Sequence, residues 1–111
     1  MLRLGTVFAA ESEIARFAKM EQSQELKRVT EYLRDLQSRI CTSLEETDGG
    51  ATFRQDVWEQ DNGSGRTYIL SNGRVFEQGG VNFSHVYGSA LPAAASSRHP
   101  ELGGNPFQAT G

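Results

Sequence analysis

The clearest pattern in the chain is a helical repeat of apolar positions between Ser23 and Thr47. The steps of three and four residues place these side chains on one stripe of a 3.6-residue helix, with charged residues on the opposite side. Asp48, Gly49 and Gly50 end the repeat, because glycine adopts the left-handed conformation of a helix C-terminus without steric cost. Such a helix needs a surface to cover its stripe, which is formed by Leu26, Val29, Leu33, Leu36, Ile40 and Leu44.

Beyond residue 50 the pattern becomes short and alternating, which predicts β-strands. The expected strands are 53–59, 66–71 and 81–87, with a loop at 61–65. Asn72-Gly73 predicts a two-residue hairpin turn in which both residues have positive φ, followed by a return at 74–78. Gly79-Gly80 is expected to break the chain again.

The last expected strand has two distinct faces. One carries Val81, Phe83, His85 and Tyr87, and the other carries Asn82, Ser84 and Val86. After Gly88 only a short helix is predicted, from Ala93 to Ser97. The fold class is therefore α+β: an N-terminal amphipathic helix followed by an antiparallel meander. Because so few strands leave a sheet edge and part of a face uncovered, we expect them to belong to a larger structure.

Composition narrows the function classes. The net charge is −3 and no basic block is present, which argues against nucleic-acid binding. No apolar run reaches the length of a membrane span. Cys41 is the only cysteine, so neither a disulfide framework nor a cysteine-pair metal site is expected. These features favour a reducing, cytoplasmic compartment.

The first 20 residues stand apart from this pattern. A short apolar patch with Arg3 has some likeness to a targeting segment, but Glu11 and Glu13 argue against a transit peptide. Two starts stay open, Met1 and Met20.

Several polar residues are candidates for chemistry, each with a structural alternative. Arg66 has the planar guanidinium that pairs with a carboxylate, or is an exposed charge at the start of a strand. His85 is a candidate acid, base or metal ligand, or a half-buried strand histidine with one hydrogen-bond partner. Asn82 and Ser84 share a face that lines a pocket or meets solvent.

Other residues favour simpler roles. Cys41 and Trp58 are expected in the core, and His99 at the surface. The sequence 63–65 lacks the lysine and following helix of a phosphate-binding loop.

Ordered segments from Leu33 to Gly111 resemble the start of the oxygen-dependent coproporphyrinogen-III oxidases. One departure is the loop at 61–65, where that family usually has a run of glycines. By this resemblance, residues 1–20 are an unaligned extension and 21–111 are part of an oxidase domain. The matching segments are Leu36-Gln37, Ile40-Cys41, Asp48-Gly49-Gly50-Ala51 with Phe53, Asp56-Val57-Trp58-Glu59, Gly65-Arg66, Gly73-Arg74-Val75-Phe76-Glu77, Gly80-Val81-Asn82-Phe83-Ser84-His85-Val86 with Gly88, Pro100-Glu101-Leu102 and Pro106-Phe107.

The resemblance implies a large antiparallel sheet flanked by helices, working as a homodimer. It implies oxidative decarboxylation of two propionates of coproporphyrinogen III to vinyl groups, which gives protoporphyrinogen IX. Molecular oxygen is the oxidant and no organic cofactor is needed, while a metal requirement stays open. The family's catalytic residues are expected after Gly111, so no catalytic or metal-binding residue is assigned here. The segment that matches a dimerisation region comprises Ile69, Leu70, Ser71, Asn72, Gly73, Arg74, Val75, Phe76, Glu77 and Gln78.

Two functional hypotheses follow from the resemblance. In the first, the chain is the N-terminal part of the oxidase and is inactive alone. In the second, it is a small non-catalytic interaction module that dimerises with the full-length oxidase. An α+β domain of unrelated function is the remaining alternative.

Overall fold

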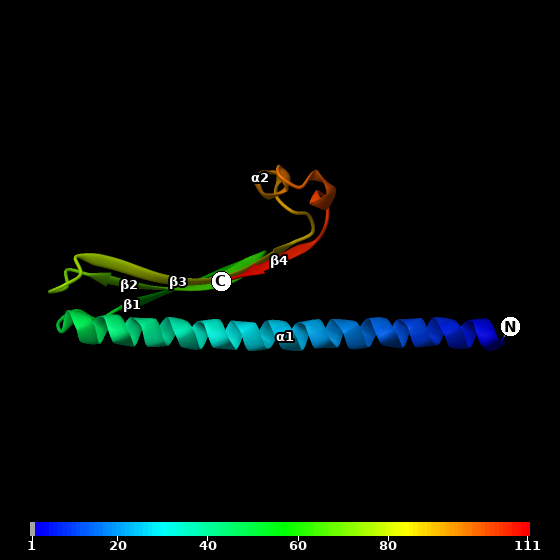
Figure 1. Ribbon diagram of the computed structural model, residues 1–111, viewed down its shortest axis with the longest axis horizontal. Helices are drawn as coiled ribbons and strands as arrows, with labels where there is room; N and C mark the ends of the chain where they lie inside the picture. The colour runs from blue at the N-terminus through cyan, green and yellow to red at the C-terminus, as the bar shows by residue number, and fades with distance from the viewer. Residues whose placement is uncertain (1) are drawn as a thin grey trace. The chain divides into compact units, whose positions relative to one another are not determined.

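The computed structural model describes the backbone of residues 2–111 and the side-chain surroundings of residues 12–111. A long helix, α1 (Leu2–Asp48), precedes four strands (Figure 1). Two compact units are present, Met1–Tyr32 and Leu33–Gly111, and α1 contributes to both. The α+β prediction is confirmed. The elements after α1 are β1 (Arg54–Gln60), β2 (Gly63–Ser71), β3 (Gln78–Gly88), the short helix α2 (Ala93–Ser96), the 3-10 turn η1 (Pro100–Leu102) and β4 (Phe107–Thr110).

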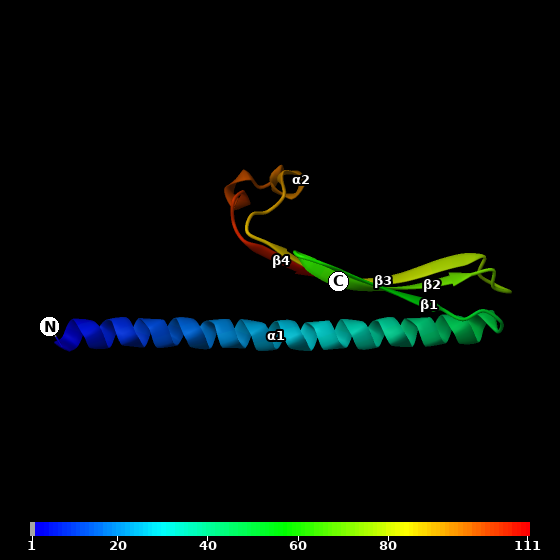
Figure 2. The same ribbon diagram turned by 180° about the vertical axis from the view of Figure 1, so that it is seen from behind.

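The four strands form one antiparallel meander in the order β1-β2-β3-β4. Arg66 of β2 lies opposite Phe83 of β3, and Thr67 lies opposite Asn82. Since successive side chains alternate between faces, Arg66 and Phe83 share one face and Thr67 and Asn82 share the other. The C-terminal part of α1 runs along the sheet on the Phe83 side (Figures 1 and 2).

The helix is longer than the sequence pattern predicted. It begins at Leu2 and not at Ser23. Residues 2–22 contain no proline and a single glycine, so backbone propensity favours helix even where the apolar repeat is weak. The predicted end is confirmed: Gly49 has φ 71°, and its N–H donates to the carbonyl of Glu45 at 2.9 Å.

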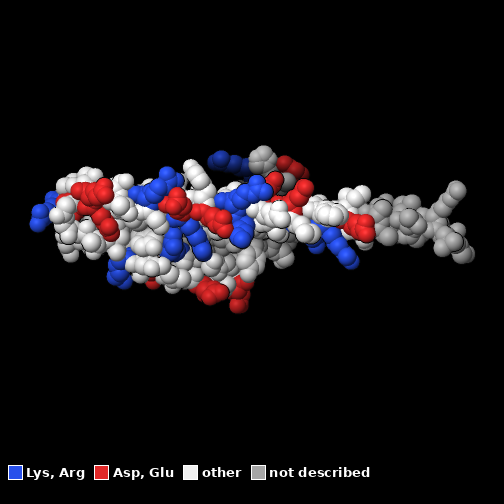
Figure 3. Space-filling model, turned by 90° about the horizontal axis from the view of Figure 1, so that it is seen from below, with Lys and Arg blue, Asp and Glu red and all other residues white. Residues whose placement is uncertain are grey.

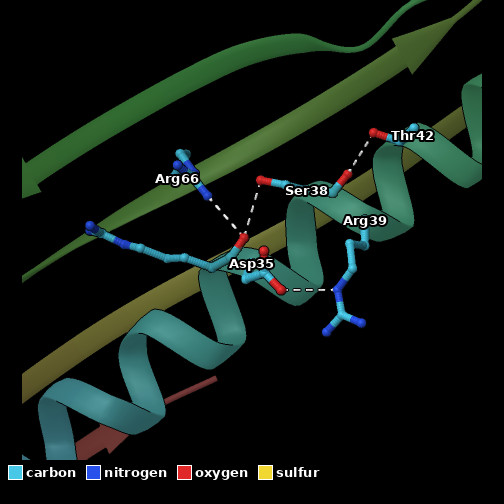
Figure 4. A network of polar contacts seen from close by, with 6 residues as sticks. Asp35, Ser38, Arg39, Thr42 and Arg66 are labelled. Carbon is cyan, nitrogen blue, oxygen red and sulfur yellow. Dashed lines mark hydrogen bonds and ion pairs between the residues drawn. The ribbon is translucent and has the colours of Figure 1, made fainter.

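The buried side of α1 overlaps the predicted stripe but is centred on different residues. Leu33, Leu36 and Leu44 of the stripe are half-buried, whereas Ile40 is exposed. The most buried positions between residues 33 and 48 are Gln37, Cys41 and Asp48. The apolar repeat did not predict the burial of Gln37 and Asp48 because both are polar. The view from below shows both signs of charge along the molecule (Figure 3). On α1, Asp35 and Arg39 form an exposed ion pair at 3.0 Å (Figure 4).

The predicted loop at 61–65 is present but shorter: Asp61 and Asn62 form a turn, and residues 63–65 already belong to β2, which begins at Gly63. Glycine is required at position 65 because the indole of Trp58 lies against its backbone, and a Cβ there would overlap the ring. Trp58 is consequently half-buried on the face opposite Phe83 and is not a core residue as predicted.

The β2–β3 connection also differs from the prediction. Asn72 has φ 55°, but Gly73 does not have positive φ. Residues 72–77 form a six-residue loop, so the predicted return at 74–78 is wrong. Gly79 and Gly80 lie inside β3 and do not break the chain.

Of the helix and the strand that follow β3, the sequence analysis predicted only the helix. The short helix is confirmed at Ala93–Ser96. β4 was missed, and it pairs with the end of β3 from Gly88–Phe107 to His85–Thr110.

The core of the described residues is small. Its buried apolar side chains are Leu70, Phe83 and Cys41, which are 1%, 2% and 7% exposed. The burial of Cys41 confirms the prediction for that cysteine. The guanidinium of Arg34 lies over the Phe83 ring, 5.2 Å from its centroid.

Replacing Phe83 by alanine should therefore lower the free energy of unfolding by about 3–5 kcal/mol, since the cavity is buried between helix and sheet. Val57→Ala is the control: Val57 is 64% exposed, so its truncation should change stability by no more than about 0.5 kcal/mol. Urea unfolding of both variants measures the difference, and equal losses would contradict this account of the core.

Candidate functional site

The amide of Gln37 joins the helix to two strands. Its Nε2 donates to the carbonyl of Arg66 at 2.6 Å and to the carbonyl of Val81 at 2.8 Å. Its Oε1 accepts the N–H of the Arg66 guanidinium at 3.0 Å. A buried amide is stable only with such partners, so Gln37 fixes where the helix sits on β2 and β3.

Arg66 completes this junction from the sheet side. Its Nη2 donates to the carbonyl of Arg34 at 3.2 Å, an oxygen that also accepts the hydroxyl of Ser38 (Figure 4). The guanidinium also lies over the ring of Tyr68, 5.3 Å from its centroid. Arg66, one of the predicted pocket residues, is thus already engaged by the helix and an aromatic ring.

Asp48 ends α1 with a buried carboxylate that is 3% exposed. Its Oδ2 accepts the N–H groups of Gly50 at 3.2 Å and Ala51 at 2.8 Å, which turns the chain from the helix toward β1. The neighbouring Glu45 carboxylate accepts the N–H of Phe53 at 2.7 Å. Together these bonds fix the whole helix-to-strand connection.

The same Asp48 carboxylate holds the β2–β3 loop. Oδ1 accepts the N–H groups of Val75 at 2.9 Å and Phe76 at 3.0 Å. Oδ2 accepts the N–H of Arg74 at 3.2 Å. Gly73 is needed beside them because a Cβ there would overlap the carboxylate.

These bonds determine the charge state of Asp48. The N–H groups of Ala51, Phe76 and Val75 favour the ionised carboxylate and outweigh its desolvation, so the pKa of Asp48 lies well below its usual value. By contrast, burial raises the pKa of the Cys41 thiol, which is typical of an unreactive core cysteine.

A groove of about 630 Å³ opens where β3 meets β4. Among the described residues, the buried Nδ1 of His85 has no hydrogen-bond partner, and neither has the hydroxyl of its register neighbour Thr110. Unpaired buried polar atoms are costly and mark places where water or a ligand binds. The groove is lined by His85, Tyr87, Gly88, Pro106, Phe107 and Gln108.

The four predicted pocket residues do not converge. Arg66 and His85 lie on the helix-covered face of the sheet, while Asn82 and Ser84 lie on the opposite face. Asn82 accepts the hydroxyl of Thr67 at 2.6 Å. The backbone of Ser84 pairs with Gly111. Of the four, only His85 lines the groove.

The predicted dimerisation segment divides into buried and exposed parts. Leu70 lies in the core, whereas Val75 at the loop is 61% exposed. Ser71, Asn72, Arg74, Glu77 and Gln78 are also exposed. A partner molecule therefore has access chiefly to the loop and its two flanks.

Within the part of the chain that the structure describes, no three His, Cys, Asp or Glu side chains gather as metal ligands. No helix in that part is long and apolar enough to span a membrane. His99 is exposed and lies 3.1 Å from Glu101, as expected for a surface histidine.

Sequence reasoning missed Gln37 and Asp48, although each had a signal. Gln37 interrupts the apolar side of a helix. Asp48 is an acid at a helix C-terminus, where the macrodipole disfavours negative charge and a compensating contact is required. The groove residues Pro106, Phe107 and Gln108 carried no comparable signal, since they become neighbours of His85 only through the β3–β4 pairing.

These features define an α+β domain in which an amphipathic helix is pinned by polar side chains to one face of a four-stranded antiparallel sheet. The family model described as Coproporphyrinogen III oxidase matches residues 28–111. The chain belongs to the coproporphyrinogen III oxidase family.

The free energy of unfolding should fall as the pH drops below about 4, because Asp48 is ionised in the folded chain at pH values where it is protonated in the unfolded chain. The stabilisation is complete above the unfolded-state pKa and is lost as the pH falls toward the folded-state pKa. Asp48→Asn should be less stable at neutral pH and should lose this part of the acid dependence. Urea unfolding between pH 7 and pH 2 measures it.

Asp56→Asn provides the matched control, since Asp56 is exposed on β1. It should keep the wild-type pH dependence. If Asp48→Asn and wild type lost stability in parallel across this range, the assigned charge state of Asp48 would be wrong.

Proposed function

We propose that this chain forms part of an enzyme that oxidatively decarboxylates coproporphyrinogen III to protoporphyrinogen IX. The observation that supports the proposal is family membership over residues 28–111, which includes the buried half of α1 and every strand. Molecular oxygen is the proposed oxidant, without an organic cofactor. The proposed setting is the cytoplasm, and the proposed assembly is a homodimer.

We propose a binding role for the groove at β3 and β4. Its volume of about 630 Å³ is typical of small-molecule sites. Phe107 and Pro106 supply apolar surface, and His85 supplies a hydrogen-bonding group that no described residue occupies. A pyrrole ring and one propionate of the substrate match this combination.

The groove does not by itself contain what the reaction needs. Decarboxylation of a propionate requires a group that accepts a proton, a site that excludes water, and cations for a multiply anionic substrate. Among the groove residues that the structure describes there is no Arg or Lys. Arg66, a candidate cation on the same face, is engaged by Gln37 and the Arg34 carbonyl. We therefore propose that these 111 residues shape the substrate site and that other residues of the enzyme carry the catalytic groups.

A second function is supported by the exposed β2–β3 loop. Val75 is an apolar side chain presented to solvent on a loop fixed by Asp48. The chain would then act as a non-catalytic module that dimerises with the full-length oxidase.

The purified chain should form no protoporphyrinogen IX from coproporphyrinogen III in air-saturated buffer. The reason is that none of the described groove residues is cationic. Product is measured by fluorescence after oxidation to the porphyrin, with a complete family enzyme as the positive control. Turnover above the non-enzymatic rate would overturn the proposed division of roles.

Coproporphyrin III should quench the emission of Trp58, the only tryptophan, because any porphyrin bound to this small domain lies within energy-transfer range. His85→Ala should raise the Kd roughly tenfold, since a hydrogen bond to a charged group contributes about 1.5–3 kcal/mol.

His99→Ala is the matched control, as it removes the exposed histidine outside the groove. Its Kd should equal that of wild type. Equal Kd values for all three proteins would place the porphyrin elsewhere, and the absence of wild-type quenching would remove the binding role of this chain.

A further inference from the structure

We propose that Thr110 is the positioning residue for His85. Its hydroxyl donates to Nδ1 of the imidazole, so that the Nε2–H group is directed into the groove as the donor to a substrate carboxylate. This role rests on the binding function proposed for the groove. It adds to that function the tautomer of His85 and the residue that sets it.

The strand register brings the two side chains together across β3 and β4 (Figure 1). Ser84 and Gly111 exchange both backbone N–H···O bonds, at 2.7 and 3.0 Å. The next pair along the strands, His85 and Thr110, is therefore a non-hydrogen-bonded pair, the type in which opposite residues lie closest, with Cα atoms typically about 4.5 Å apart. Rotation about the side-chain torsions can then join a hydroxyl to a ring nitrogen without moving either strand.

Both side chains have a buried polar atom that needs a partner. Among residues 12–111, neither Nδ1 of His85 nor Oγ1 of Thr110 makes a hydrogen bond. If the hydroxyl donates to Nδ1, one bond satisfies both the hydroxyl hydrogen and the lone pair of the ring nitrogen. If Nδ1–H donated instead, the hydroxyl hydrogen would stay buried and unpaired, which costs free energy, so the first direction is favoured.

Two other hydroxyl groups lie near the imidazole, and neither is as well placed. The ring of Tyr87 is 6.0 Å from that of His85 between centroids, but its hydroxyl donates to the Asp61 carbonyl at 3.1 Å. Ser64 lies opposite His85 on β2. The N–H of Tyr87 donates to Asn62 on that side, and alternate residues of a strand direct their backbone groups to the same neighbour. The Ser64–His85 pair is thus of the hydrogen-bonded type, in which opposite side chains lie farther apart.

The proposed bond determines what His85 offers to a ligand. A neutral imidazole carries one proton, so a hydrogen bond accepted at Nδ1 places that proton on Nε2. His85 lines the groove while its Nδ1 is buried, so the ring edge that carries Nε2 is the one a ligand meets. An ionised carboxylate only accepts hydrogen bonds and needs this donor. Thr110 acts through His85 by holding the ring in the productive tautomer and orientation.

Nitrogen NMR of the full 111-residue chain tests the bond without any ligand. In alkaline buffer, where imidazoles are neutral, His85 should carry its proton on Nε2 and show the Nδ1 signal of a hydrogen-bonded nitrogen. The His99→Ala variant assigns the signals, since the chain has two histidines. Thr110→Val keeps the side-chain shape and suits a strand, and it should shift the Nδ1 signal to that of an unbonded nitrogen. Thr110→Ser should restore the wild-type signal, and Ser64→Ala, the matched control, should leave it unchanged.

Binding of coproporphyrin III, followed by the quenching of Trp58, tests whether the bond serves the ligand. Thr110→Val should raise the Kd about threefold to tenfold because the orientation of His85 is lost, and Thr110→Ser should bind nearly as wild type does. In the His85→Ala background, Thr110→Val should have no further effect, since Thr110 acts only through the imidazole. Should circular dichroism show that Thr110→Val is unfolded, Thr110→Ala takes its place in both measurements.

The outcomes separate the role of Thr110 from the binding function of the groove. If Thr110→Val left the Nδ1 signal unchanged, or if Ser64→Ala moved it instead, Thr110 would not be the positioning residue even where the porphyrin binds. Equal Kd values for Thr110→Val and wild type, with His85→Ala still weakened, would also overturn its role and leave the groove as the binding site. An absence of quenching in wild type would remove the binding function and, with it, the role of Thr110.

Discussion

The carboxylate of Asp48 is the interaction on which the rest of this structure depends. It accepts five backbone N–H groups, from Gly50 and Ala51 after the helix and from Arg74, Val75 and Phe76 in the β2–β3 loop. An acid at a helix C-terminus opposes the macrodipole, so these donors must compensate both that repulsion and the loss of solvent. One side chain thus couples the end of the helix, the start of the sheet and the shape of its exposed loop.

Polar side chains specify this domain because its apolar core is small. Burial of Leu70, Phe83 and Cys41 favours packing of α1 on the sheet. Because apolar burial is non-directional, it would allow α1 to shift along the sheet. Gln37 removes that freedom, since its amide matches the carbonyls of Arg66 and Val81 in only one position. Arg66 adds the reciprocal bond and a further one to the Arg34 carbonyl. Hydrophobic burial therefore drives the packing of helix against sheet, and the hydrogen bonds of Gln37 and Arg66 determine where along the sheet the helix lies.

The hydrogen bonds that hold helix and sheet together also limit which polar side chains are free to bind a ligand. Arg66 has the chemistry to bind a propionate, yet its donors serve the helix–sheet junction. His85 is the residue with unused hydrogen-bonding capacity beside the groove, among the residues described. Membership of the coproporphyrinogen III oxidase family suggests the substrate proposed for this groove. The described groove residues include no cation, so we propose that the groove contributes to binding and not to catalysis.

The sequence alone determined the fold class, the end of the helix, the three longer strands within a few residues, and the family resemblance. These depend on local periodicity and on glycine at residue 49, which act over a few neighbouring positions. Only the tertiary structure decided that Gln37 and Asp48 are buried, because these polar side chains become favourable inside only when carbonyls and N–H groups from residues 66–81 reach them. It also placed Trp58 against Gly65, replaced the expected two-residue turn by a carboxylate-bound loop, and brought residues 106–108 to His85. Each of these depends on a pairing between different elements of the fold, which the local pattern within one element cannot encode.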